Sequence, residues 1–250
     1  MPFLSTLGAA TIRGFKTLGP RARLLSYFGT ATPLSEARRN LSATSIGDYA
    51  LFSGGYTGAY SAVVDAYSAS LVRSTPTALS VGRDYLSATS IGNYALFGGG
   101  YTGAYSAEVD AYNTSLVRST PTALSVARRY VAATSIDNYA LFGGGYTGTF
   151  NGVVDAYSAS LVRSTPTALS EARNYLQATS IGNYALFGGG STASYSAVVD
   201  AYNTSLVRSE PIPLSEARHS LSATSIGDYA LFGGGTTVSY SAAVDVYQVS

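Results

Sequence analysis

The sequence predicts an all-β protein made of five copies of one unit. The stretch Ser42–Gly55 returns almost unchanged four more times along the chain. The apolar residue that precedes each copy recurs every 45 residues, at Leu41, Leu86, Val131, Leu176 and Leu221. Tyr (21 residues) and Gly (27) are abundant and charged residues make up only 12%, as is typical of tyrosine-rich strands joined by tight turns. Four antiparallel strands in ~45 residues form one propeller blade, so we expect a five-bladed β-propeller of four-stranded antiparallel blades.

The second copy illustrates the expected order of elements within a blade. Its strands, which we call a to d, are expected at residues 86–91, 94–98, 109–112 and about 116–124. Gly92-Asn93 joins a to b as a two-residue hairpin loop, and the leading glycine suits a type II′ turn. Strand b ends in the doublet Gly99-Gly100, where positive φ is expected, and the b–c loop follows at residues 101–106. Pro121 places strand d at an edge, and residues 125–130 form the d–a connection to the next blade.

The N-terminal end of the repeat region has the strand that its C-terminal end lacks. Residues 1–23 lie outside the repeat, and residues 24–250 form the propeller. Residues 24–34 look like a strand d without a blade, while the last copy ends with its strand c at residues 241–247. An unpaired strand edge exposes a row of backbone donors and acceptors. We therefore expect the N-terminal strand d to pair with this strand c and close the ring. An open β-solenoid is the alternative, but the two-residue loops favour antiparallel hairpins.

Several features of each copy resemble the kelch-repeat β-propeller family. These are the apolar strand, the glycine doublet Gly99-Gly100, the segment Val109–Asn113 and Arg128, which precedes the next blade. The resemblance covers about residues 24–250. Kelch repeats usually carry a Trp on strand c or d, whereas this chain has no Trp. The WD40 family fits less well, because its repeats need Gly-His and Trp-Asp pairs and this chain has one His.

The N-terminal segment is basic and free of acidic residues. Its charge follows the apolar residues, unlike a secretory signal, and its glycines interrupt the amphipathic helix of a transit peptide. A flexible tail and an arm that orders against a partner both remain open. Residues 7–15 resemble the short leaders that begin some tailed-phage virion proteins, which implies attachment to a larger assembly. The candidate arm residues are Phe3, Leu4, Ile12, Arg13, Phe15 and Lys16.

The composition argues against several kinds of site. With no Cys and one His, the chain offers no disulfide, no thiolate or two-histidine metal site and no cysteine nucleophile, so we expect no cofactor. Gly98-x-Gly100-x-x-Gly103 matches the dinucleotide fingerprint, but a strand rather than a helix follows it. No apolar run approaches the ~20 residues of a membrane span. The repeat body is slightly acidic, which argues against a nucleic-acid partner.

One acidic position recurs in every copy. It is occupied by Asp65, Asp110, Asp155, Asp200 and Asp245. Because structural ion pairs are commoner than active sites, we expect these aspartates to be structural. They would form a turn or inter-strand hydrogen bond, or pair with the recurring arginines Arg73, Arg118, Arg163 and Arg208.

The copies differ mainly in two connections, the b–c loop and the d–a connection. In an antiparallel blade both emerge on the same face, opposite the nearly uniform a–b turns. Rigid scaffolds carry binding residues on loops, although exposed loops also drift neutrally. We call the candidate binding residues of this face the varied face: Arg39, Asp84, Tyr85, Arg129, Tyr130, Asn174, Tyr175 and His219.

These observations favour a non-enzymatic scaffold. We expect it to bind a protein or a glycan, such as a host-surface molecule, through the varied face. The arm would attach it to a phage virion, as part of the tail, a fibre or the capsid surface. The expected location is the virion, and otherwise the cytoplasm. Two alternatives remain, a carbohydrate-active propeller enzyme that uses acids such as Asp84 or Glu108, and a cellular kelch adaptor.

Overall fold

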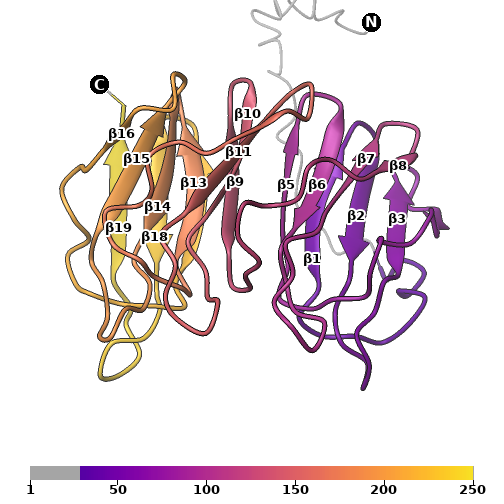
Figure 1. Cartoon of the computed structure of the whole chain (residues 1–250), viewed down its shortest axis with the longest axis horizontal. Coiled ribbons are helices and arrows are strands. Elements are labelled where there is room, and N and C mark those ends of the chain that lie inside the picture. The colour runs from indigo at the N-terminus through magenta and orange to yellow at the C-terminus, as the bar shows by residue number, and fades with distance from the viewer. Residues whose placement is uncertain (1–28, 250) are drawn as a thin grey trace, which may run out of the picture. The chain divides into compact units, whose positions relative to one another are not determined.

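The described part of the chain is entirely β. The structure is a computed structural model that describes residues 29–249, and all structural statements concern these residues. They contain five antiparallel sheets and no helix, which confirms the all-β prediction (Figure 1). Within them there is accordingly no helix with the length and apolar character to cross a membrane. Within them, residues 31–249 belong to one compact unit.

Each sheet repeats the same strand order, and we number the sheets as blades 1 to 5 along the chain. Strands a are β1 (Ser42–Ile46), β5 (Ser87–Ile91), β9 (Ala132–Ile136), β13 (Gln177–Ile181) and β17 (Ser222–Ile226). Strands b are β2 (Tyr49–Ser53), β6 (Tyr94–Gly98), β10 (Tyr139–Gly143), β14 (Tyr184–Gly188) and β18 (Tyr229–Gly233). Strands c are β3 (Val64–Ser68), β7 (Val109–Asn113), β11 (Val154–Ser158), β15 (Val199–Asn203) and β19 (Val244–Gln248). Strands d are β4 (Arg73–Ser74), β8 (Arg118–Ser119), β12 (Arg163–Ser164) and β16 (Arg208–Ser209).

The hairpin between strands a and b follows from its loop residues. In blade 2, Ile91 pairs with Tyr94 across the loop. Gly92 has a φ of 51°, and Asn93 is not among the residues with positive φ, so the loop fits a type II′ turn. In blade 3 Asp137 takes the first position with a φ of 40°, which aspartate tolerates better than most residues.

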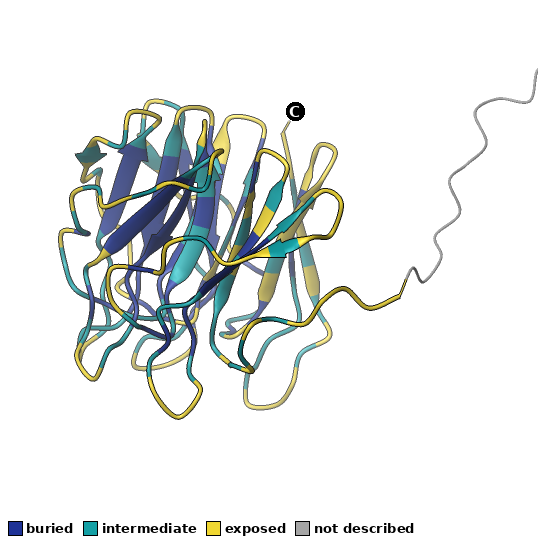
Figure 2. Cartoon of the chain, turned by 90° about the vertical axis from the view of Figure 1, so that its right-hand side faces the viewer, coloured by how far each residue is buried: buried dark blue, intermediate teal, exposed yellow. Residues whose placement is uncertain are grey.

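The core lies between consecutive blades. One face of blade 1, with Leu51 and Val64, packs against the facing side of blade 2, with Phe97 and Tyr112. The same packing recurs between blades 2 and 3, 3 and 4, and 4 and 5. Most buried residues lie in the strands, and most exposed residues lie in the connections at the ends of the sheets (Figure 2). Each blade therefore buries its apolar face only against a neighbour, as expected for a propeller-like repeat.

Strand d is much shorter than predicted. The sequence predicted about residues 116–124, but β8 contains only Arg118–Ser119. Leu116 lies in the preceding turn, with a φ of 61° and its amide donating to the Asn113 carbonyl at 2.8 Å. Pro121 has no amide hydrogen to extend the pairing.

The fifth blade has three strands in the described residues, so the prediction of four-stranded blades holds for blades 1 to 4. Ring closure by a strand at residues 24–34 stays a prediction: residues 29–34 form no strand, and residues 24–28 lie outside the described part. The outer face of blade 5 is open, because the Ile226 side chain is 71% exposed. Its counterparts in blades 1 to 4 are 3–5% exposed.

Residues 31–38 take the place of a d–a connection on blade 1. The Tyr67 hydroxyl donates to the Thr32 carbonyl at 2.7 Å, and the Ser35 amide donates to Asp65 at 3.1 Å. Tyr112 and Asp110 make the same contacts with the true connection between blades 1 and 2. The chain before blade 1 therefore runs as if a preceding blade were present.

The recurring aspartate is structural, but its shortest contact was not foreseen. Asp110 contacts Arg118 at 3.3 Å, as predicted, and Arg83 at 2.8 Å. Arg83 is fully buried and lies in the d–a connection that leads into the same blade. Equivalent pairs occur in all five blades at 2.6–2.8 Å, with both side chains fully buried in blades 1 to 4 and Asp245 partly exposed in blade 5. Each aspartate thus ties the incoming connection to strand c.

The glycine doublet allows two blades to approach. Gly99 has a φ of 70°, and a Cβ added there would lie 2.7 Å from the Arg128 carbonyl oxygen of the next blade. The Gly100 amide donates to that same carbonyl at 2.9 Å. A side chain at Gly99 would therefore push apart the two groups that join the blades.

This close approach predicts that Gly99→Ala destabilises more than Gly92→Ala in the same blade. Gly92 has a similar φ of 51°, but its added Cβ would meet only Ala159 at an ordinary 3.5 Å. Backbone strain alone costs about 1–2 kcal/mol, and the steric conflict adds roughly 1–3 kcal/mol at Gly99. Urea unfolding measures both. Equal losses of unfolding free energy would show that close packing at Gly99 contributes nothing.

Candidate functional site

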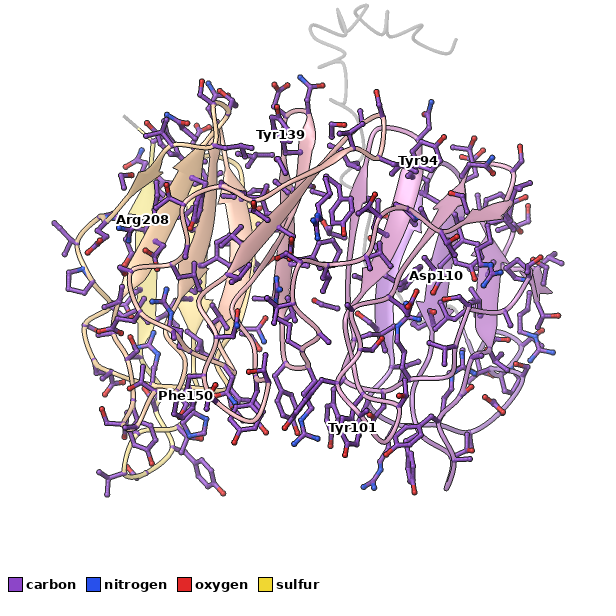
Figure 3. All side chains as sticks on the ribbon, in the orientation of Figure 1. Tyr94, Tyr101, Asp110, Tyr139, Phe150 and Arg208 are labelled. Atoms are coloured by element: carbon purple, nitrogen blue, oxygen red, sulfur yellow. The ribbon has the colours of Figure 1, made fainter. Side chains whose placement is uncertain are left out.

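The two varied connections meet at one end of the blades. Arg39, Asp84, Arg129, Asn174 and His219 each form an isolated antiparallel bridge with the first residue of a b–c loop in the same blade. Figure 3 places Tyr101 and Phe150, from two b–c loops, at the lower end and Tyr94 and Tyr139, beside two a–b turns, at the upper end. The residues of the varied face therefore share one end of the sheets with the b–c loops.

The varied face contains buried and exposed members. Asp84 and Asn174 are each only 5% exposed. Arg39 and Tyr175 are exposed, whereas Tyr85, Arg129, Tyr130 and His219 are half-buried. Burial of Asp84 and Asn174 was not predicted. The backbone bridge alone does not account for it, because Arg39, Arg129 and His219 form the same bridge and stay exposed or half-buried.

Three tyrosines and the histidine form an inner row from blade to blade. The ring centroids of Tyr85 and Tyr130 are 4.6 Å apart, and those of Tyr130 and Tyr175 are 4.4 Å apart. His219 continues the row at 6.0 Å from Tyr175. Burial, together with the neighbouring Tyr175, raises the pKa of Tyr130 to about 12. The Tyr130 hydroxyl thus stays protonated at physiological pH, able to donate a hydrogen bond.

The inner tyrosines have an unusual backbone conformation. Tyr85, Tyr130 and Tyr175 have φ values of 50–56°, where bulky residues are rare. Leu116, Leu161 and Leu206 also have positive φ, but these leucines pack against the core. The tyrosine rings instead stack on one another at the varied face. Glycine or asparagine would adopt this φ at lower cost, so the rings themselves account for the choice of residue.

A second aromatic row runs along the b–c loops and was missed at the sequence level. Its rings follow one another with edge-on contacts and centroid distances of 5.5–6.1 Å. The row contains Tyr56, Tyr60, Tyr101, Tyr105, Tyr146 and Phe150. It stops at blade 4, where Ser191 replaces the first tyrosine of the loop. The repeated YTGAY motif was the available signal.

Arg129 lies between the two aromatic rows. Its guanidinium carbon is 4.8 Å from the centre of the Tyr101 ring and 4.7 Å from that of Tyr130. Tyr85 and Tyr105 are each 5.8 Å away. These cation–π contacts hold the charge without neutralising it. Arg39 makes a similar contact with Tyr56 at 5.5 Å.

Asp84 faces these two arginines. One of its carboxylate oxygens accepts a hydrogen bond from the Asn40 side chain at 3.3 Å. The other, Oδ1, is buried and has no hydrogen-bond partner within the described chain. Burial raises the pKa of Asp84, although the Asn40 hydrogen bond and the charges of Arg129 and Arg39 partly offset this effect. An under-satisfied buried carboxylate is costly to keep, which is typical of binding sites.

These groups line an open pocket of about 230 Å³. It spans blades 1 to 3 and combines two guanidinium groups, one carboxylate and four tyrosine rings. The lining residues are Arg39, Tyr56, Tyr60, Asp84, Tyr85, Tyr101 and Arg129. Four of them belong to the predicted varied face. Tyr130, Asn174, Tyr175 and His219 lie further along the same end.

The remaining candidates lie elsewhere. Glu108, the other acid named for a possible enzyme, is exposed and lines a separate hollow with Val81 and Thr102. The predicted arm residues Phe3 to Lys16 lie outside the described residues. Residues 29–249 contain no group of three acidic or histidine side chains that could hold a metal ion.

Comparison with known proteins gives no further guide to the site. No protein-family model matches the chain, and no curated protein matches it.

The raised pKa of Asp84 predicts a pH-dependent cost. Because the folded-state pKa exceeds the unfolded one, folding loses stability as pH rises from the unfolded pKa through the folded pKa. Asp84→Asn removes the charge, so it should raise the melting temperature at pH 7 and change it little at pH 3.5. Thermal melts followed by circular dichroism at both pH values measure this difference.

Asp65→Asn is the matched control with the opposite sign. Burial raises the pKa of Asp65, but hydrogen bonds from Ser35 and Arg38 outweigh it and hold the pKa below its ordinary value. Its stabilisation is therefore present above the unfolded pKa and lost as pH falls. Asp65→Asn should lower the melting temperature at pH 7, with a smaller effect at low pH. If both variants lose stability at pH 7, the account of Asp84 is wrong.

Proposed function

We propose that the protein is a non-enzymatic scaffold that binds a protein or a glycan through its varied face. The observation that carries this proposal is that two rows of aromatic rings lie beside arginines that have no ion-pair partner among the described residues. Among the described residues, neither Arg39 nor Arg129 forms an ion pair, while the structural arginines Arg83 and Arg128 are paired. Tyrosine and arginine are the residues that binding surfaces favour, because they combine large contact area with donors.

The arrangement of acids supports binding over carbohydrate hydrolysis. Glycoside hydrolysis generally needs two carboxylates that flank the scissile bond. Within the described residues the pocket holds one carboxylate, that of Asp84, and Glu108 lines a different hollow. A single buried carboxylate beside two arginines suits recognition of a ligand that has both donors and acceptors.

The proposal extends to a larger assembly, the virion of a tailed phage. The N-terminal residues 1–35 carry four basic and no acidic residues, and residues 7–15 resemble virion-protein leaders. In this arrangement residues 1–23 attach the scaffold and the varied face meets a host-surface glycan or protein. Attachment and binding would then lie in different parts of the chain.

The proposal also includes a closed five-bladed ring. Blade 5 leaves Ile226, Val244 and Val246 more than half exposed, although the Ile226 and Val244 positions are covered by the next blade in every other copy. At the other end, blade 1 leaves Ala43 and Ala50 exposed, on the side by which blades 2 to 5 receive a neighbour. The two open faces expose the positions that consecutive blades bury against each other. In this proposal the missing strand d comes from residues 24–34, of which residues 29–34 form no strand in the structure. Closure would remove both apolar surfaces from water.

Closure predicts that Ile226→Asp destabilises the protein strongly. In a closed ring the new carboxylate would be buried between blades, at a cost of several kcal/mol. Ile136→Asp provides the reference for a covered site, since Ile136 is 3% exposed. Val238→Asp, at a residue that is 99% exposed, provides the control for an open site. If Ile226→Asp melts like Val238→Asp, blade 5 stays open in solution and the closure proposal fails.

The proposed binding face predicts where a partner leaves its footprint. In the native assembly, hydroxyl-radical footprinting should protect Tyr130 and Tyr175 more than Tyr94 and Tyr139 at the a–b end. Tyr130→Ser should also reduce recovery of the partner at least tenfold, because a stacked ring is lost from the contact. Asn93→Ser, on the a–b turn, serves as the matched variant and should have no effect. Protection confined to the a–b turns would refute the proposal.

A further inference from the structure

The pocket at Arg39, Asp84 and Arg129 is built by differences between nearly identical blades. The position after the buried arginine is Arg39 in blade 1, Asp84 in blade 2 and Arg129 in blade 3, and Asn174 and His219 follow. Two arginines with an acid between them therefore occur at one place only within the five blades. The aromatic row of the b–c loops covers the same three blades and ends at Ser191. Two independent sets of substitutions thus converge on one pocket.

The pocket requires a ligand with a negative charge. Arg39 and Arg129 lie on tyrosine rings at 5.5 and 4.7–4.8 Å and form no ion pair among the described residues. A guanidinium in this state presents a planar set of donors that matches a carboxylate. The only acid in the lining is Asp84, so the pocket keeps a net positive charge.

The pocket also requires a ligand with hydroxyl or amide donors. Asp84 is 5% exposed, and its Oδ1 atom has no hydrogen-bond partner in the described residues. A buried acceptor without a donor destabilises the folded protein, and a ligand that donates a hydrogen bond to it would remove this cost. An anion without hydrogen, such as sulfate, has no donor to offer and would be repelled by this carboxylate.

The size and the tyrosine rings narrow the choice. A volume of about 230 Å³ lies below the ~300–1,000 Å³ of pockets for drug-sized ligands. The four tyrosines offer apolar ring surface beside polar hydroxyl groups. A pyranose ring presents C–H groups to such rings and hydroxyl groups to an acceptor. A carboxylate on the same ring would reach the arginines.

We propose that this pocket binds a sugar that carries a carboxylate, such as a uronic acid within a glycan. The inference rests on the proposed function and names the ligand class for part of the varied face. Arg39 and Arg129 bind the carboxylate, Asp84 accepts a hydrogen bond from a sugar hydroxyl, and the ring packs on the tyrosines. The varied face beyond Tyr130 is left to neighbouring sugars of the same glycan.

The test compares two probes that differ only at C6, where one carries a carboxylate and the other a hydroxymethyl group. Isothermal titration calorimetry of the full chain with methyl β-glucuronide and methyl β-glucoside should give at least tenfold tighter binding of the glucuronide. Raising the salt concentration should weaken the binding of the glucuronide and leave the binding of the glucoside unchanged. Equal binding of the two sugars, or tighter binding of a glutamate-rich peptide than of oligoglucuronides of similar length, would overturn the proposal.

Matched variants locate the site. Arg129→Met and Arg39→Met should each weaken glucuronide binding at least tenfold. Arg39 is exposed, so its replacement leaves the core intact even if Arg129→Met lowers stability. Asn93→Ala, at an a–b turn, should bind like the parent protein. Unchanged binding in Arg39→Met and Arg129→Met would overturn the assignment.

The same variants separate this inference from the proposed function. If the native partner leaves its footprint on the varied face but binds Arg39→Met and Arg129→Met normally, the acidic-sugar assignment fails and the binding face stands. If the footprint lies on the a–b turns, the proposed function fails whatever the calorimetry gives.

Discussion

One buried ion pair per blade determines where the chain can vary. Arg83 and Asp110, 2.8 Å apart and both fully buried, tie the incoming d–a connection to strand c. The same arginine donates to the Phe97 carbonyl on strand b at 3.0 Å, so it contacts two strands at once. A buried pair gains little net stability because desolvation opposes the Coulomb attraction. Its effect here is geometric, since it fixes the backbone just before the residue that varies.

The glycine doublet continues this constraint into the next blade. The Gly100 amide donates to the carbonyl of Arg128, the buried arginine of blade 3. The arginine therefore anchors its own blade through its side chain and the preceding blade through its backbone. Position 129 follows directly, held by the bridge to Tyr146. Because this frame is repeated, Arg39, Asp84 and Arg129 are presented in equivalent places and differ only in their side chains.

The sequence allowed strands a, b and c to be predicted closely, because their apolar pattern and hairpin glycines act locally. The predicted length of strand d was wrong, because a longer strand needs hydrogen bonds that Pro121 and the turn at Leu116 do not allow. The arginine before each blade was recognised as a repeated feature, yet the arginine expected to pair with Asp110 was Arg118 alone. Spacing along one chain cannot rank two arginines that converge on one aspartate from different connections.

In the candidate site, too, some features could be predicted from the sequence and others could not. The varied face was predicted from differences between copies, which needs only the repeat. The burial of Asp84 and the row from Tyr56 to Phe150 were missed, because both depend on contacts between neighbouring connections. A chain of equivalent blades offers equivalent surfaces, so selective recognition requires that the symmetry be broken. Here it is broken in blades 1 to 3 by charge and aromatic rings together. Blades 4 and 5 keep the frame while Ser191 and Thr236 replace the tyrosines, so the fold and the site impose separate demands on the sequence.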